Sequence, residues 1–192
     1  MSTPINILTL VGSLRAESTN RKLAELAAEV APDGVTVEIY DGLRDIPFYD
    51  EDIDGPDAPA AATALREALE RSDALLFVSP LYNGGVPSHI KNGLDWLSRP
   101  QGNEHITGLP VAAIGTSWGD HGGSFGHEQL RKSGEIAGAS PLDEVNLSIG
   151  GSLARFADTH PREDAEVVEQ VRAAITAIAG AARERAAAPV AA

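Results

Sequence analysis

Hydrophobic and polar positions follow two different periods along this chain, and the periods predict strands and helices in turn. Five short runs of aliphatic and β-branched residues are bounded by glycine, proline or polar residues, a pattern typical of strands. They cover residues 5–11, 35–40, 74–79, 109–115 and 145–149. The third run is apolar almost throughout, which indicates a strand buried on both faces.

Between these runs, apolar residues recur every three or four positions, as on the buried face of a helix. Ser18 or Thr19 is suited to cap the first helix. Further helices are predicted at residues 60–71, from Pro87, at about 124–137 and from about Pro161. The last of them is expected to bury Val168, Val171, Ile175, Ile178 and Ala182.

Strands that alternate with helices indicate an α/β fold, in which one parallel sheet has helices on both faces. Both the Rossmann and the flavodoxin strand order fit, and both bind ligands at the carboxyl ends of the strands. We expect a single domain over residues 1–188 and a frayed tail at 189–192. Residues 41–60 form an acidic loop whose one basic residue is Arg44, either a solvated surface loop or a flap beside a site or an oligomer contact.

The charge balance limits the partners of this protein. Its 192 residues include 15 Lys and Arg against 28 Asp and Glu, a formal net charge of −13. Such a surface repels nucleic acid and anionic membranes, so a bound phosphate must be held locally by backbone amides or a placed arginine. The apolar runs are too short to span a membrane, and we expect no signal peptide. Cysteine is absent, which fits the reducing cytoplasm, the location we predict.

The loop at residues 12–20 follows the first strand and opens the first helix. A helix start presents unpaired amide N–H groups to an anion, and neutral or cationic side chains add further donors. Here those side chains are Ser13, Arg15, Ser18, Thr19 and Asn20, a set suited to a terminal phosphate. The glycine spacing of dinucleotide and triphosphate loops is missing. A plain helix cap is the alternative.

Two further loops have unusual compositions. Residues 79–87 contain two prolines and two adjacent glycines, so this backbone is stiff and can lie close to a ligand. Tyr82 and Asn83 at its tip suit a flat heteroaromatic ring edged with carbonyl and N–H groups, although an ordinary turn is the alternative. The glycine-rich loop at 115–123 carries Trp118, which either lines a pocket or packs. Together the three loops describe a mononucleotide with a large flat ring, and FMN fits better than NAD.

Two segments resemble the flavodoxin-like NAD(P)H-dependent FMN reductases, a family that includes quinone, azo-dye and chromate reductases. One runs from Gly12-Ser13-Leu14-Arg15 to Ser18-Thr19-Asn20-Arg21-Lys22-Leu23. The other, more specific, runs from Pro80-Leu81-Tyr82-Asn83-Gly84-Gly85-Val86-Pro87 to Lys91-Asn92-Gly93-Leu94-Asp95-Trp96. The resemblance covers roughly residues 4–180. It implies a flavodoxin-like three-layer sandwich with a five-stranded parallel sheet in the order 2-1-3-4-5.

The resemblance also implies bound FMN and NAD(P)H as co-substrate. Hydride would pass from the nicotinamide to the flavin and then to a small-molecule acceptor such as a quinone, an azo compound, a metal oxyanion or free flavin. By position, Ser13, Arg15, Ser18, Thr19 and Asn20 would hold the phosphate. Pro80, Leu81, Tyr82, Asn83 and Gly84 would contact the ring and ribityl chain, and Ser117 and Gly119 would complete the pocket.

No catalytic side chain is assigned, because flavin chemistry demands no protein acid or base, and no metal is expected. The family implies a homodimer or homotetramer with the helix near 91–96 at the interface. Two departures stand out. Leu81 replaces a Glu that some relatives use in subunit contacts, and the third loop with Trp118 and His121 differs from the usual small-residue form.

Two other functions compete with this prediction. Residues 122–126 match the Gly-x-Ser-x-Gly elbow of serine hydrolases, with Ser124 as nucleophile and His160 as base. However, Ser124 lies nine residues beyond Gly115, whereas an elbow serine directly follows its strand. The second alternative is a flavodoxin-like electron carrier without reductase activity, whose acidic surface would suit a basic redox partner. The match at 80–96 favours the reductases.

Overall fold

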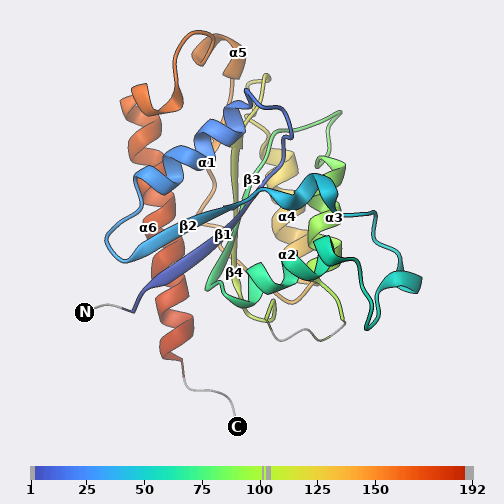
Figure 1. Ribbon diagram of the computed structural model, residues 1–192. Helices are drawn as coiled ribbons and strands as arrows, with labels where there is room; N and C mark the ends of the chain where they lie inside the picture. The colour runs from blue at the N-terminus through green and yellow to red at the C-terminus, as the bar shows by residue number, and fades with distance from the viewer. Residues whose placement is uncertain (1–2, 101, 103–104, 189–192) are drawn as a thin grey trace.

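A computed structural model of the chain describes residues 3–100, 102 and 105–188 (Figure 1). The tail predicted at 189–192 lies outside the described residues. All strand pairs are parallel, and the sheet has the order β2-β1-β3-β4-β5, as predicted. The four long strands are β1 (Ile5–Val11), β2 (Val35–Tyr40), β3 (Ala74–Val78) and β4 (Pro110–Thr116).

The fifth strand position differs from the prediction of one strand at 145–149. Two short strands share the edge beside β4: β5 (Ser140–Pro141) pairs with its start, and β6 (Ser148–Ile149) pairs with its end. Between them the chain turns, with the Val145 N–H donating to the Leu142 carbonyl at 3.1 Å. Val145 is nevertheless buried, so its apolar character serves the core rather than the ladder.

Helices cover both faces of the sheet (Figure 1). One face carries α1 (Thr19–Glu29) and α6 (Ala165–Ala187). The other carries α2 (Ala60–Glu70), α3 (Ser88–Leu97) and α4 (Ser124–Ile136). The two hydrophobic clusters follow from the side-chain alternation of the strands, since Ile7 and Val11 face α1 whereas Leu8 and Leu10 face α2 and α3.

The remaining elements are short. α5 (Ser152–Arg155) follows β6, and 3₁₀ turns occur at η1 (Gly42–Asp45), η2 (Glu51–Ile53) and η3 (Pro161–Glu163). The last helix begins after η3 rather than at its proline, with Asp164 as the N-cap that accepts from the Val167 N–H at 3.2 Å. Its fully buried first position is therefore Val167, and the predicted Val168 is only partly buried.

The acidic loop at 41–59 is attached to α3 rather than loose. Asn92 donates to the Pro47 carbonyl and accepts from the Tyr49 N–H, at 2.9 and 2.8 Å. The Trp96 indole N–H also donates to Pro47, at 2.9 Å. Arg66 grips Asp54 with two hydrogen bonds of 2.8 and 3.0 Å, which hold the pKa of that carboxyl below its usual range. The loop is thus a fixed surface element, and it contributes no residue to the large cavity described next.

Candidate functional site

The carboxyl end of β1 leads into a helix start that is rich in donors. Ser18 is the N-cap of α1, and its hydroxyl accepts from the Arg21 N–H at 3.3 Å while its own proton stays available. As in the first turn of any helix, the N–H groups of Thr19 and Asn20 have no intrahelical acceptor. Ser13 and Arg15 stand in the loop before the helix. These donors and one exposed cation are suited to an anion, even in a protein whose overall charge is negative.

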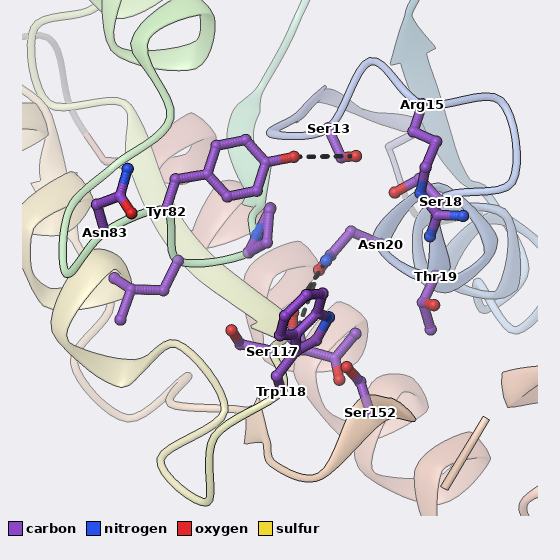
Figure 2. Close-up of a pocket in the computed structure, with 13 residues that line it drawn as sticks. Ser13, Arg15, Ser18, Thr19, Asn20, Tyr82, Asn83, Ser117, Trp118 and Ser152 are labelled. Atoms are coloured by element: carbon purple, nitrogen blue, oxygen red, sulfur yellow. Dashed lines mark hydrogen bonds between the residues drawn. The ribbon is translucent and has the colours of Figure 1, made fainter. Parts of the chain in front are cut away.

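After β3, the tip of the second loop is a two-residue turn. Tyr82 and Gly85 exchange backbone hydrogen bonds of 3.0 Å, and Asn83 and Gly84 both have positive φ, at 50° and 79°. This is the geometry of a type I′ turn, for which Asn-Gly is the favoured pair. The N–H groups of Asn83 and Gly84 are not used by the turn itself. The Tyr82 hydroxyl donates to the Ser13 hydroxyl at 3.4 Å, which joins this loop to the first one (Figure 2).

A reciprocal pair of hydrogen bonds joins the first loop to the end of β4. The Asn20 side chain donates to the Thr116 carbonyl and accepts from the Thr116 N–H, both at 2.9 Å (Figure 2). Close approach requires glycine at position 115, because a Cβ there would lie 2.2 Å from the Ser79 carbonyl oxygen. This pair uses the side-chain oxygen and one of the two amide N–H groups of Asn20, so the second amide N–H and the backbone N–H remain as donors.

A buried histidine supports the same edge from behind. The His127 ring bonds the Ser79 carbonyl through Nε2 and the Ser148 hydroxyl through Nδ1, both at 2.8 Å. A carbonyl only accepts, so Nε2 carries the proton. Burial lowers the pKa of His127 to about 4, with the nearby Arg131 charge acting in the same direction. The neutral ring therefore ties the ends of β3 and β6 to α4.

These loops enclose a cavity of about 490 Å³ (Figure 2). Ten of the twelve residues predicted to bind a cofactor line it: Ser13, Arg15, Ser18, Thr19, Asn20, Pro80, Leu81, Tyr82, Asn83 and Ser117. Gly84 and Gly119 are not among its lining residues. The cavity volume falls in the range of about 300–1,000 Å³ that small-molecule sites occupy.

Three lining residues were not among those twelve: Thr116, Trp118 and Ser152. Trp118 was noted as a pocket candidate but not placed among the cofactor contacts, and its side chain is 74% exposed. Ser152 follows β6, so the same reasoning about carboxyl ends, applied to the last strand, would have found it. Thr116 is the last residue of β4. The sequence did not indicate it, because its backbone and not its side chain bonds Asn20.

The serine-hydrolase geometry is not formed. Ser124 is the first residue of α4, well beyond the end of β4, rather than a residue on a sharp strand-to-helix elbow. His160 caps η3, where its ring accepts from the Arg162 N–H at 3.2 Å. Ser124 therefore opens an ordinary helix, and this alternative is not supported.

A parallel sheet in this order, with an anion site and a ring-sized cavity at its carboxyl edge, defines a flavodoxin-like mononucleotide-binding protein. Residues 5–154 match the family described as NADPH-dependent FMN reductase, and the chain belongs to that family. The predicted oxidoreductase class, the FMN cofactor and the NAD(P)H co-substrate are thereby confirmed.

Individual relatives agree with this assignment. A quinone reductase of Pseudomonas putida is 36% identical over 164 residues, which cover 85% of this chain and 88% of that protein. A 2-hydroxy-1,4-benzoquinone reductase of a Burkholderia species is 39% identical over 127 residues, or 66% and 68% of the two chains. The structure of FerB, a flavoenzyme NAD(P)H:(acceptor) oxidoreductase from Paracoccus denitrificans, superimposes with a TM-score of 0.78 at 29% identity and covers 92% and 98% of the two chains.

The residues present fit FMN. Helix-start N–H groups, hydroxyls and Arg15 match a phosphate in number and chemistry. Pro80, Leu81 and Tyr82 supply apolar and aromatic surface to the cavity, and Asn83 beside them supplies amide groups that suit the carbonyl and nitrogen acceptors of a flavin ring. Both halves of the mononucleotide thus find partners of matching polarity in one cavity.

Proposed function

We propose that this protein is an FMN-dependent NAD(P)H:quinone reductase, with its FMN in the cavity at the carboxyl ends of β1, β3 and β4. The observation that carries the proposal is the combination, in one cavity, of an anion site at the start of α1 with the aromatic and amide groups of the second loop. A quinone is the favoured acceptor because the relatives from Pseudomonas putida and Burkholderia carry quinone reductase names.

FMN held in this cavity would supply the hydride and electron-transfer chemistry between the nicotinamide and the acceptor. The chain's own residues position that chemistry. Ser13, Ser18 and Thr19 hydroxyls and the helix-start N–H groups hold the phosphate, with Arg15 as its counter-charge. The Asn83 N–H, which the turn leaves unused, would donate to the edge of the ring, and a donor that is oriented in advance would stabilise negative charge there.

The wall of the cavity lacks any side chain that would act as an acid or base near neutral pH. Its thirteen lining residues in the described part of the chain include no aspartate, glutamate, histidine or lysine. Protons for the acceptor therefore come from solvent at the open mouth, where Tyr82 and Trp118 are 49% and 74% exposed. We expect the two substrates to use this mouth in turn, because both rings need the same open face of the flavin.

The proposal also covers the oligomeric state and the cellular location of the protein. We infer a cytoplasmic homodimer or homotetramer in which α3 contributes to the subunit contact. An exposed Ile136 and a hollow of about 600 Å³ between α3 and the end of α4 support a contact on this side. The absence of cysteine from the sequence supports a reducing compartment. No helix among the described residues is both long and apolar enough to cross a membrane.

The decisive experiment loads the purified protein with FMN and follows NAD(P)H oxidation with 1,4-benzoquinone. We expect a flavin absorbance that remains after desalting and quinone-dependent turnover. Thr19→Val, which removes one lining hydroxyl at constant shape, should weaken FMN binding, whereas Thr176→Val on α6 should not. A protein that stays colourless with added FMN, or loaded protein that reduces no quinone, would refute the proposal.

A further inference from the structure

A second cavity of about 330 Å³ lies on the other side of the first loop, at the carboxyl ends of β1 and β2. It shares Ser13 and Arg15 with the large cavity, so the two cavities meet at the loop that we assign to the FMN phosphate. Its wall also includes Arg21, Tyr40 and Arg44. Neither the sequence motifs nor the proposed function gives this cavity a role.

The three arginines of this cavity differ in whether a carboxylate neutralises them. Arg21 forms ion pairs with Asp41 and, at 3.1 Å, with Glu25. Within the described part of the chain, no carboxylate lies at ion-pairing distance from Arg15 or Arg44. Arg44 donates one hydrogen bond to the Leu14 carbonyl at 3.1 Å, which holds its guanidinium against the first loop and leaves other N–H groups free.

The second cavity is locally positive, although the molecule as a whole is negative. Three arginines face two carboxylates in the cavity wall, so its charged groups leave a surplus of positive charge in a chain whose net charge is −13. Two guanidinium groups that no described carboxylate neutralises, at one small cavity, are suited to a phosphate, whose geometry the planar fork matches with two hydrogen bonds.

The position of the cavity indicates which phosphate. When a nicotinamide reaches the flavin in the large cavity, the other end of the dinucleotide needs a site along the same edge of the sheet. NADPH differs from NADH by a 2′-phosphate, and such a group needs an arginine whose charge no carboxylate already neutralises. Here Asp41 and Arg44 both follow β2, but Asp41 is already paired with Arg21, whereas no described carboxylate pairs with Arg44.

We propose that the second cavity binds the 2′-phosphoadenosine end of NADPH, with Arg44 receiving the 2′-phosphate. This inference rests on the proposed NAD(P)H reductase function, since it places the far end of the same donor. It makes Arg44 a residue that determines preference for NADPH over NADH, through binding and not through chemistry at the flavin.

The test uses the FMN-loaded protein, so that the FMN phosphate site is filled. Calorimetry measures the Kd of 2′,5′-ADP and of 5′-AMP for the wild type and for Arg44→Ala, Arg44→Lys and Arg172→Ala. Arg172 is an exposed arginine on α6, which contributes no residue to the second cavity. FMN content and unfolding temperature confirm that each variant is folded and loaded.

We expect Arg44→Ala to raise the Kd of 2′,5′-ADP about tenfold, the value of one charge-assisted hydrogen-bonded contact. Arg44→Lys should give a smaller rise, and Arg172→Ala none. The fall in kcat/KM for NADPH should exceed the fall for NADH by a similar factor. An unchanged Kd in Arg44→Ala, or an equal loss for 5′-AMP, would overturn the assignment of the 2′-phosphate. Failure of the wild type to oxidise either nicotinamide would instead refute the proposed function, and calorimetry would still decide whether the anion site exists.

Discussion

Asn20 and Thr116 exchange two hydrogen bonds of 2.9 Å although they are 96 positions apart in the sequence. Both residues are buried, at 4% and 1% exposure. The pair fixes the start of α1 against the end of β4, so two of the three cofactor loops are held in register by the protein itself. A site that is ordered before its ligand arrives loses less conformational entropy on binding.

Asn20→Ala should therefore weaken both the fold and the binding of FMN. It removes both hydrogen bonds and leaves the buried Thr116 N–H without a partner, which costs about 1–3 kcal/mol in the free energy of unfolding. The higher helix propensity of alanine offsets a few tenths of that loss. Urea unfolding of FMN-free protein and fluorescence titration with FMN measure the two effects.

Thr19→Val is the matched comparison, because it changes a neighbouring residue of the same helix start and leaves the Asn20–Thr116 hydrogen bonds intact. It should weaken FMN binding with little effect on unfolding. If Asn20→Ala weakened FMN binding without lowering the free energy of unfolding, Asn20 would act as a direct ligand of FMN and not as a structural link to Thr116.

Gly115→Ala should destabilise the protein at the cofactor edge of the sheet. The new Cβ would lie 2.2 Å from the Ser79 carbonyl oxygen, 2.8 Å from Asn20 Oδ1 and 2.9 Å from His127 Nε2. The backbone at Ser79 and the side chains of Asn20 and His127 would have to move, and such overpacking costs about 1–3 kcal/mol or more. Thermal unfolding with and without FMN would show the loss.

Gly180→Ala provides the control for this prediction. Gly180 lies within α6, and a Cβ added there would meet no atom within 4 Å apart from its chain neighbours and the backbone of its own helix, so alanine should stabilise the protein by about 0.5–1 kcal/mol. A Gly115→Ala variant as stable as wild type would show that the edge of the sheet is more compliant than these distances indicate.

His127 should make the protein less stable in acid. Its folded pKa of about 4 lies below the ordinary value of 6.5, so the unfolded chain takes up the proton first as the pH falls. The stabilisation is complete above about pH 6.5 and is lost between about 6.5 and 4, at a limiting slope of about 1.4 kcal/mol per pH unit. Urea unfolding across this range measures the slope.

His127→Gln keeps an N–H donor for the Ser79 carbonyl but does not titrate. Its unfolding free energy should depend less steeply on pH between about 6.5 and 4, by nearly one proton. His89 and His160 also have lowered pKa values, through burial in each case first, so the difference between variant and wild type is the meaningful quantity. Identical slopes in the two proteins would contradict the buried, neutral state of His127.

The sequence predicted most of the layout because strand periodicity and loop composition are local properties. Each long strand and the helices predicted at 60–71 and 124–137 came within two residues of their observed bounds, as did the predicted starts of α1 and α3. Ten of the twelve proposed cofactor residues line one cavity. The division of the edge strand into β5 and β6 was not predicted, because Val145 is apolar for burial in the core, which the pattern does not distinguish from strand pairing.

The hydrogen bonds between polar side chains and distant backbone groups could not be predicted from the sequence. Asn20 was predicted as a phosphate donor, and the structure adds a bond from its side chain to the backbone of Thr116, which no side-chain pattern indicates. Asn92 and Trp96 were noted as part of a family motif, but the structure assigns them the task of anchoring the acidic loop through Pro47. Polar side chains that bond a distant main chain look the same in sequence as those that bond a ligand.

Trp118 should determine how well flat acceptors bind. Its indole lines the large cavity and is 74% exposed, while its backbone is fixed on one side, since the Ser117 N–H donates to the Ile149 carbonyl at 3.2 Å. A ring held in this way offers a stacking face to a planar quinone, and aromatic pairs contribute about 0.5–1.5 kcal/mol beyond burial. Trp118→Ala should raise the KM for an aromatic quinone several-fold, up to about tenfold.

Ferricyanide separates stacking from general damage, because this acceptor is not planar and takes electrons without a ring contact. Its reduction should change far less than that of the quinone, and Trp118→Phe should restore much of the quinone KM. Unfolding should shift by no more than about 0.5 kcal/mol, since an exposed side chain packs little. An equal loss with both acceptors would mean that Trp118 positions the flavin, and its ring would then belong to the cofactor wall and not to the acceptor site.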